Sequence, residues 1–181
     1  MQVLIATEFR VGKYNNQFYL ASQAYTIFKR YADAFGPVSL FARVEELSEI
    51  PIGYKQAQYV DKIIEVKSLF NELTGIGSVS HAIEKVDLII GRLPSVIAYR
   101  AYDYAKENQV PYLAELMCDG WHSYWSHSFQ GKLIAPYMDA KMRSVTKNAN
   151  YAIYVTEKYL QKKYPCNCPN INASNVVISA T

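Results

Sequence analysis

The segment 117–127 combines an acidic side chain with aromatic rings, a combination that suits the binding of a polyhydroxylated ligand. Asp119 follows a predicted buried strand, where its carboxylate can act as a base or accept hydrogen bonds from hydroxyl groups. Trp121 can stack on an apolar sugar face, and His122 lies beside it. His122 and His127 are five residues apart, which does not place both on one helix face and argues against a zinc site. The alternative is that these rings cover a neighbouring helix. Two exposed tryptophans without a ligand would be costly, which favours binding.

A second candidate site is the segment 7–16, which follows the first predicted strand. It contains one glycine, so the dinucleotide-binding pattern G-x-G-x-x-G is absent. Gly12 and Lys13 resemble the end of a Walker A loop, but Thr7 and Tyr14 occupy two of its defining positions. We expect Gly12, Lys13, Asn15 and Asn16 to precede a helix N-terminus and to hold an anion or hydroxyl groups there. The alternative is an ordinary turn between a strand and a helix.

Other charged patterns carry less chemical information. Glu107 and Glu115 match Glu-x7-Glu, but one lies at a predicted helix end and the other in a predicted strand, so we interpret the match as chance. Asp-x-Asp is absent from the sequence, and Cys166-x-Cys168 alone favours unpaired thiols, so no metal site is expected. Lysine and arginine recur on the predicted helices 130–147 and 157–164 and could contact anionic lipid, although a solvated helix face is the commoner explanation. The residues concerned are Lys132, Lys141, Arg143, Lys147, Lys158, Lys162 and Lys163.

The elements that must position these residues alternate along the chain. Short apolar runs predict strands at 3–6, 38–42, 63–66, 87–90, 110–116, 151–155 and 176–178. Apolar residues spaced by three and four predict helices over 18–35, 94–108, 130–147 and 157–164, and over 68–85 with interruptions at two glycines. Segments 44–57 and 117–129 are predicted loops. This alternation predicts an α/β fold: a Rossmann-like parallel sheet with helices on both faces.

Composition limits the classes of protein that remain. The chain has 181 residues, 50% of them hydrophobic and 19% charged, which fits a single globular domain. A net charge of +3 is too small to indicate a nucleic-acid-binding protein. The sequence has no apolar run of membrane-spanning length and no secretory signal at its start, and its three cysteines do not form an even set. We therefore expect a cytoplasmic protein, which can lie at the inner face of the cell membrane.

Five segments together resemble bacterial GT-B glycosyltransferases of family 4, especially those that build surface polysaccharides. They are 1–18, Val86 to Pro94, Val110 to Trp121, Tyr151 to Leu160 and Ser174 to Ile178. Their order and spacing carry the resemblance, which covers nearly all of the chain. It implies that residues 1–181 are the single N-terminal domain of such an enzyme, with 165–181 leading toward a C-terminal donor domain.

The resemblance also implies roles for particular residues. Gly12 and Lys13 match the turn that faces the acceptor and the donor phosphate, and Asp119 matches the aspartate at the cleft end of its strand. Thr156 and Glu157 match the cleft-facing end of a later strand, whereas Cys118 stands near a position where many members have histidine.

The expected function is thus the acceptor-binding half of a retaining, metal-independent glycosyltransferase. Its partners would be a saccharide or lipid-linked sugar acceptor and a donor-binding C-terminal domain or subunit. No cofactor is expected, since the nucleotide-sugar donor would bind mainly that other domain. The alternative is a non-catalytic Rossmann-like ligand-binding or regulatory module, which the absence of a complete catalytic motif favours.

Overall fold

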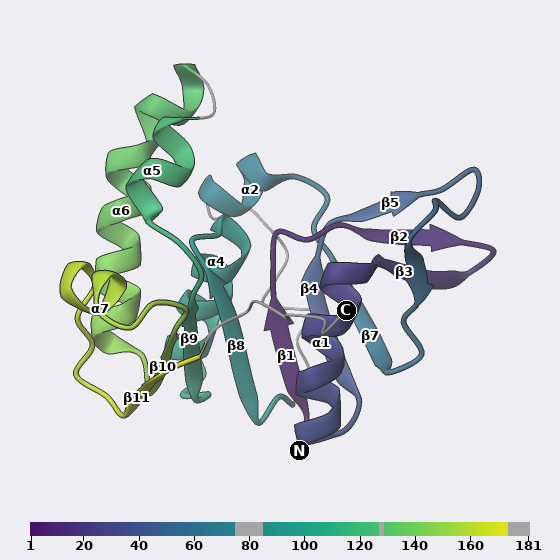
Figure 1. The fold of residues 1–181 in the computed structure, drawn as a ribbon, viewed down its shortest axis with the longest axis horizontal. Helices are drawn as coiled ribbons and strands as arrows, with labels where there is room; N and C mark the ends of the chain where they lie inside the picture. The colour runs from purple at the N-terminus through teal and green to yellow at the C-terminus, as the bar shows by residue number, and fades with distance from the viewer. Residues whose placement is uncertain (75–84, 127–128, 174–181) are drawn as a thin grey trace, which may run out of the picture.

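A seven-stranded parallel sheet forms the centre of the molecule (Figure 1). The computed structural model describes residues 1–74, 85–126 and 129–173. The strand order is β11-β10-β9-β8-β1-β4-β7, and every pair is parallel. The strands are β1 (Val3–Ala6), β4 (Val38–Ala42), β7 (Val60–Glu65), β8 (Leu88–Leu93), β9 (Tyr112–Leu116), β10 (Tyr151–Tyr154) and β11 (Asn170–Asn172).

Helices cover both faces of this sheet, as the alternating pattern predicts. The described helices are α1 (Ser22–Phe35), α2 (Leu69–Thr74), α4 (Val96–Glu107), α5 (Gly120–Trp125), α6 (Phe129–Asn148) and α7 (Tyr159–Lys163). Successive side chains of a strand point to opposite faces, so Leu4 packs in the core with α4 and α6 while Val3 and Ile5 pack in the core with α1. The continuous burial of β1 reflects these two cores. The predicted fold class is confirmed.

The direction in which the chain crosses the sheet changes once, beside β1. From β1 the chain proceeds outward through β4 to β7, then returns to β8, on the other side of β1. In parallel sheets of this kind, ligands bind at the carboxyl ends of the strands where the order reverses. The carboxyl ends of β1 and β8 are therefore the first place to look for a site.

A second, four-stranded sheet was not predicted. It has the order β5-β2-β3-β6 and consists of β2 (Val11–Tyr14), β3 (Gln17–Ala21), β5 (Val44–Glu46) and β6 (Tyr54–Gln56). β2 and β3 form an antiparallel hairpin. The prediction that helix 18–35 begins at Phe18 is wrong, because α1 begins at Ser22. The loop predicted over 44–57 contains two short strands of this sheet.

One further prediction is wrong, and two others extend outside the described residues. Segment 117–129 is not a continuous loop, because α5 forms within it and α6 begins at Phe129. Only the start of the helix predicted over 68–85 is described, as α2; positions 75–84 and the strand predicted at 176–178 lie outside the described residues. Within the described part of the chain, no helix is long and apolar enough to cross a membrane.

Candidate functional site

A groove of about 700 Å³ lies at the carboxyl ends of β1, β8 and β9, beside the reversal of strand order. This volume is in the range of small-molecule sites. Helix α2 forms one wall, and helices α5 and α6 form the other. Most of the side chains on these walls are apolar. The lining residues described are Glu8, Leu69, Phe70, Leu73, Pro94, Val96, Cys118, Ser123, Tyr124, Gln130, Gly131 and Ile134.

Glu8 is the acidic side chain of the groove. Its Oε1 accepts hydrogen bonds from the Ser95 hydroxyl at 3.0 Å and from the Val96 backbone amide at 3.1 Å. Its Oε2 lies 3.4 Å from the Arg43 guanidinium. Ser95 in turn caps α4 by accepting a hydrogen bond from the Ala98 amide. The positive end of α4 is therefore already compensated by a carboxylate of the protein, which makes it an unsuitable site for a phosphate.

Polar groups gather at the strand-end side of the groove. Tyr124 lines the groove near Glu8, and burial followed by the charge of Glu8 raises the pKa of its hydroxyl well above the usual value. Tyr124 therefore stays protonated and can donate a hydrogen bond at neutral pH. The Cys118 thiol lies 3.0 Å from the Ser123 hydroxyl. The groove thus offers hydrogen-bonding groups at its base and apolar walls above them.

Asp119 lies between α5 and α7 and contacts both. Its Oδ1 accepts hydrogen bonds from the backbone amides of Trp121 and His122, so it caps α5. Its Oδ2 accepts hydrogen bonds from the Tyr159 hydroxyl and, at 2.5 Å, from the Lys163 ammonium group. Burial opposes ionisation, but the hydrogen bonds of Lys163, Tyr159 and His122 outweigh it and lower the pKa. These contacts make Asp119 part of the connection between α5 and α7, and its catalytic role stays a prediction.

The other predicted contact residues also lie away from the groove. Gly12 and Lys13 belong to β2 and Asn15 and Asn16 to its turn, so the prediction that they precede a helix N-terminus is wrong. The Lys13 ammonium group is 2.7 Å from a Glu46 carboxylate oxygen. The physical reason is local: both asparagines adopt positive φ, which closes a two-residue hairpin before a helix can start.

The remaining predicted residues belong to α5 and α7. The Trp121 ring stacks on Trp125 with centroids 5.1 Å apart, and His122 is exposed. The Thr156 hydroxyl accepts a hydrogen bond from the Leu160 amide at the start of α7, and Glu157 is exposed. None of these four is among the described residues that line the groove. Figure 1 shows the second sheet and the α5–α6 pair on opposite sides of the strand ends.

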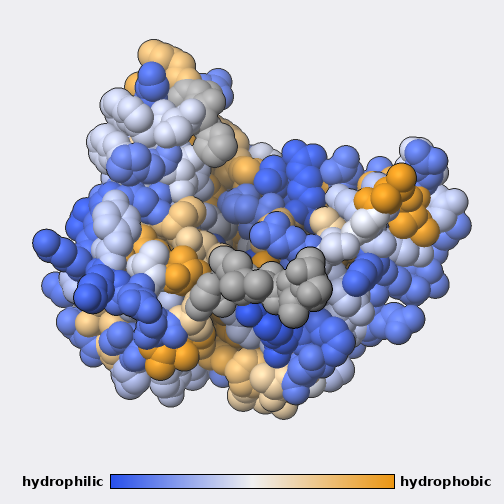
Figure 2. Space-filling view, viewed as in Figure 1, coloured by the Kyte–Doolittle hydropathy of each residue, from blue (hydrophilic) through white to orange (hydrophobic). Residues whose placement is uncertain are grey.

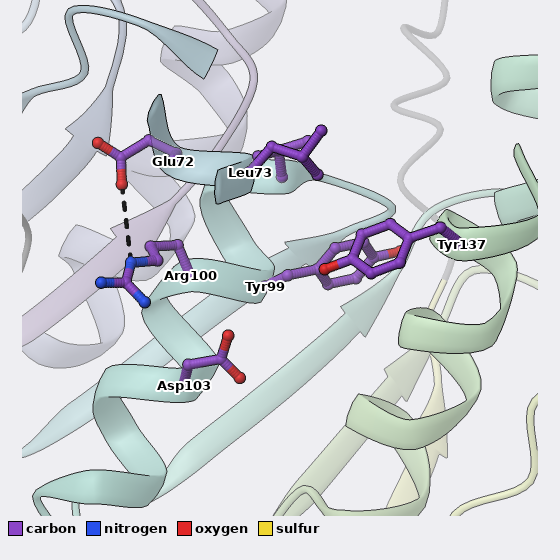
Figure 3. Close-up of a pocket in the computed structure, with 7 residues that line it drawn as sticks. Glu72, Leu73, Tyr99, Arg100, Asp103 and Tyr137 are labelled. Carbon is purple, nitrogen blue, oxygen red and sulfur yellow. Dashed lines mark ion pairs between the residues drawn. The ribbon is translucent and has the colours of Figure 1, made fainter. Parts of the chain in front are cut away.

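A smaller pocket of about 170 Å³ lies between α2, α4 and α6 (Figure 3). Glu72 is directed at Arg100, with 3.9 Å between its Oε2 and the Arg100 Nε. Burial raises the pKa of Glu72, and the nearby Arg100 opposes that effect. Asp103 is engaged by Lys141 at 2.7 Å. These ion pairs attach α2 and α6 to α4, so they hold the two walls of the larger groove in place.

The buried ion pair between Arg92 and Glu115 was not predicted from the sequence. Arg92 Nε lies 2.7 Å from Glu115 Oε2, and both side chains are almost fully buried. The Arg92 guanidinium also lies over the rings of Phe9 and Phe28. A signal was present, since Glu115 lies inside the predicted strand 110–116 and Arg92 closely follows the predicted strand 87–90, and charges in buried strands are normally paired. Among the described residues, no cluster of three or more His, Cys, Asp or Glu side chains could hold a metal ion.

The fold of this chain resembles that of a solved structure. It is similar to a domain of a GT-B glycosyltransferase: sucrose-phosphate synthase from Thermosynechococcus elongatus aligns with a TM-score of 0.58 and 12% identity. The alignment covers 96% of this chain and 47% of that one, and at this identity it shows the fold alone.

A relative is found by sequence as well. The chain is 32% identical over 175 residues to Protein CapJ of Staphylococcus aureus. The match covers 92% of this chain and 45% of that protein, so the chain spans less than half the length of this curated relative. No protein-family model matches the chain. The structural alignment therefore shows a shared fold, and the sequence match shows similarity to part of Protein CapJ.

Proposed function

We propose that this chain is the acceptor-binding half of a retaining, metal-independent glycosyltransferase of the GT-B family 4 type. It would take part in polysaccharide biosynthesis, where a sugar moves from a nucleotide-sugar donor to a saccharide or lipid-linked acceptor. The donor would bind mainly a C-terminal domain or subunit. The observation that carries the proposal is the groove at the carboxyl ends of β1, β8 and β9, next to the reversal of strand order.

The groove supports an acceptor more than a nucleotide. The carboxylate of Glu8 occupies the N-terminus of α4, where a phosphate would otherwise find backbone amides. Glu8 and the Tyr124 hydroxyl can instead bind hydroxyl groups of a sugar, one as acceptor and the other as donor. The walls contributed by Leu69, Leu73 and Ile134 suit an apolar portion of the same molecule, which favours a lipid-linked acceptor.

In this proposal the chain acts by positioning. Glu8 would hold an acceptor hydroxyl, and the rigid strand ends would fix that hydroxyl relative to a donor presented from the other half. Bringing two bound reactants into register supplies a large part of many rate enhancements. The retaining chemistry and the lack of a metal requirement rest on the sequence resemblance to family 4.

Binding to the purified chain tests the proposal. A panel of saccharides, lipid-linked sugars and nucleotide sugars would be screened by saturation-transfer NMR, and the hits quantified by calorimetry. We expect an acceptor-type sugar to bind, and Tyr124→Ala to weaken it about tenfold, the usual effect of losing one buried ring contact. Lys13→Ala is the matched control because Lys13 lies in the second sheet, and it should leave binding unchanged.

Three outcomes would contradict the proposal. Binding of a nucleotide sugar in the groove, with no acceptor bound, would make this the donor-binding half. Loss of acceptor binding in Lys13→Ala but not in Tyr124→Ala would move the site to the hairpin. If neither class of sugar binds, the non-catalytic module becomes the better interpretation.

A further inference from the structure

The free end of the α5–α6 pair carries large apolar side chains on its surface. Phe129 and Leu133 are 76% and 68% exposed, and they lie one turn apart on α6. Trp125 of α5 is 43% exposed and lies next to Lys132, whose ammonium group is 5.9 Å from the Trp125 ring centroid. Figure 2 shows this apolar surface at the end of the pair, with hydrophilic atoms beside it. Trp125, Phe129, Lys132 and Leu133 are called the apex below.

The apex lies in a segment without acidic residues, unlike the later part of α6. The sequence from Gly120 to Met138 contains no aspartate or glutamate. Beyond that segment, Arg143 of α6 lies 2.9 Å from Asp139, and Lys141 lies 2.7 Å from Asp103. The apex therefore combines apolar rings with a positive charge and no nearby negative charge from its own segment.

Another exposed apolar pair on the molecule differs in this respect. Ile50 and Ile52 are 43% and 105% exposed, in the connection between β5 and β6. Glu45, Glu46 and Glu49 precede them. Exposure of apolar side chains alone thus does not distinguish the apex, whereas exposure together with positive charge does.

We propose that the apex docks on the surface of an anionic lipid bilayer. Aromatic and leucine side chains partition into the boundary between headgroups and acyl chains, and lysine binds anionic headgroups while its stem remains among apolar groups. Gln130 and Ile134, on the next face of α6, line the groove, and Phe70 of α2 lines its opposite wall. Docking through the apex would therefore bring the groove close to the lipid surface. The proposal concerns lipid binding alone and does not depend on glycosyl transfer.

The experiment is vesicle co-sedimentation with the purified chain. Vesicles of phosphatidylcholine containing about 30% phosphatidylglycerol provide an anionic surface, and pure phosphatidylcholine vesicles the neutral comparison. We expect binding to the anionic vesicles, and at least about a tenfold loss of partitioning for Phe129→Ser/Leu133→Ser. Lys132→Glu should reduce binding to anionic vesicles more than Lys132→Ala does. Circular dichroism would verify that each variant is folded.

Ile50→Ser/Ile52→Ser is the matched control, since it removes the same number of exposed apolar side chains beside negative charges. It should bind vesicles like the original chain. Equal loss in this control, or absence of binding by the original chain, would overturn the proposal. Light scattering measures whether the chain dimerises. The proposal would also be overturned if the chain forms a dimer, does not bind vesicles, and becomes a monomer in Phe129→Ser/Leu133→Ser. The apex would then be an interface between two copies of the chain.

Discussion

The carboxylate of Asp119 joins three parts of the chain, because its hydrogen-bond donors come from α5 and α7 while it follows β9. Tyr164, which accepts a hydrogen bond from the Gly120 amide and donates one to Asp139, extends the same network to α6. Burial and the Asp139 hydrogen bond raise the pKa of Tyr164 well above its usual value, so its proton is retained. At this position an aspartate connects α5 with α7.

This geometry predicts a pH-dependent loss of stability in Asp119→Asn. The variant should lower the free energy of unfolding at neutral pH by about 1–2 kcal/mol, because the partly buried Lys163 ammonium group and the exposed Tyr159 hydroxyl lose a charged acceptor. The pKa of Asp119 in the folded state is below the ordinary 3.8, so its stabilisation is complete above 3.8 and declines as the pH falls through the lower folded-state value. The difference in free energy of unfolding between the original chain and Asp119→Asn should thus become smaller in strong acid.

Urea unfolding of both proteins at pH values above and below 3.8 measures this difference. Asp33→Asn is the control, since Asp33 forms an exposed pair with Lys29 and should cost about 0.5 kcal/mol or less. If this difference in free energy of unfolding stays constant across the pH range, packing and not charge accounts for the destabilisation in Asp119→Asn.

At the scale of elements, the β2–β3 hairpin replaces what the sequence suggested was a ligand-binding loop. Val11 and Leu20, one from each strand, are fully buried in the core beneath α1. Asn15 and Asn16 have φ values of 48° and 59°, the backbone of a type I′ turn. The apolar spacing that began at Phe18 was interpreted as helical because short strands and helix starts share such spacing.

The turn gives a specific prediction at position 16. Asn16→Val should destabilise the protein by about 1–2 kcal/mol, because a β-branched residue at positive φ is strained. Asn16→Gly should be neutral or slightly stabilising, since Asn-Gly is the preferred type I′ sequence. Thermal unfolding of both variants measures the difference. Asn172→Val in exposed strand β11 is the control and should have little effect; an equally small effect of Asn16→Val would contradict the hairpin.

At the scale of the whole molecule, the two apolar cores share one sheet. Residues of β1 alternate between the two cores, so both cores depend on the same strand. We therefore expect the two cores to unfold together. The two tryptophans, however, both lie in α5, at the edge of the fold beside the groove. Tryptophan fluorescence therefore reports the unfolding of α5, which forms part of the groove wall. Far-ultraviolet circular dichroism reports the unfolding of all helices and strands.

We predict that urea unfolding monitored by these two signals gives one transition with coincident midpoints, as expected for a single cooperative unit of this size. Phe129→Ser/Leu133→Ser, which removes only exposed side chains, should leave both midpoints in place. A tryptophan signal that changes at clearly lower urea than the dichroism would mean that α5 and α6 unfold separately, and the groove would then be a dynamic site.

Local patterns were sufficient for much of the fold. Runs such as Val3 to Ala6 have to be buried on both faces, and the alternation of such runs with helical spacing leads to a parallel sheet covered on both sides. The sequence also predicted where to look for a site, since ligands of such sheets bind at strand ends. It did not predict what the candidate residues contact: Lys13 and Asp119 have the right chemical types, yet their partners are Glu46 and Lys163.

The sequence by itself determined which segments are buried and how strands and helices alternate, because burial and period are properties of consecutive residues. Only the tertiary structure decided which polar groups remain available to a ligand. Glu8 reaches Ser95 across 87 positions of the chain, and Arg92 meets Glu115 across 23. Such pairings depend on which strands are neighbours in the sheet, and that information is absent from the local pattern around either residue.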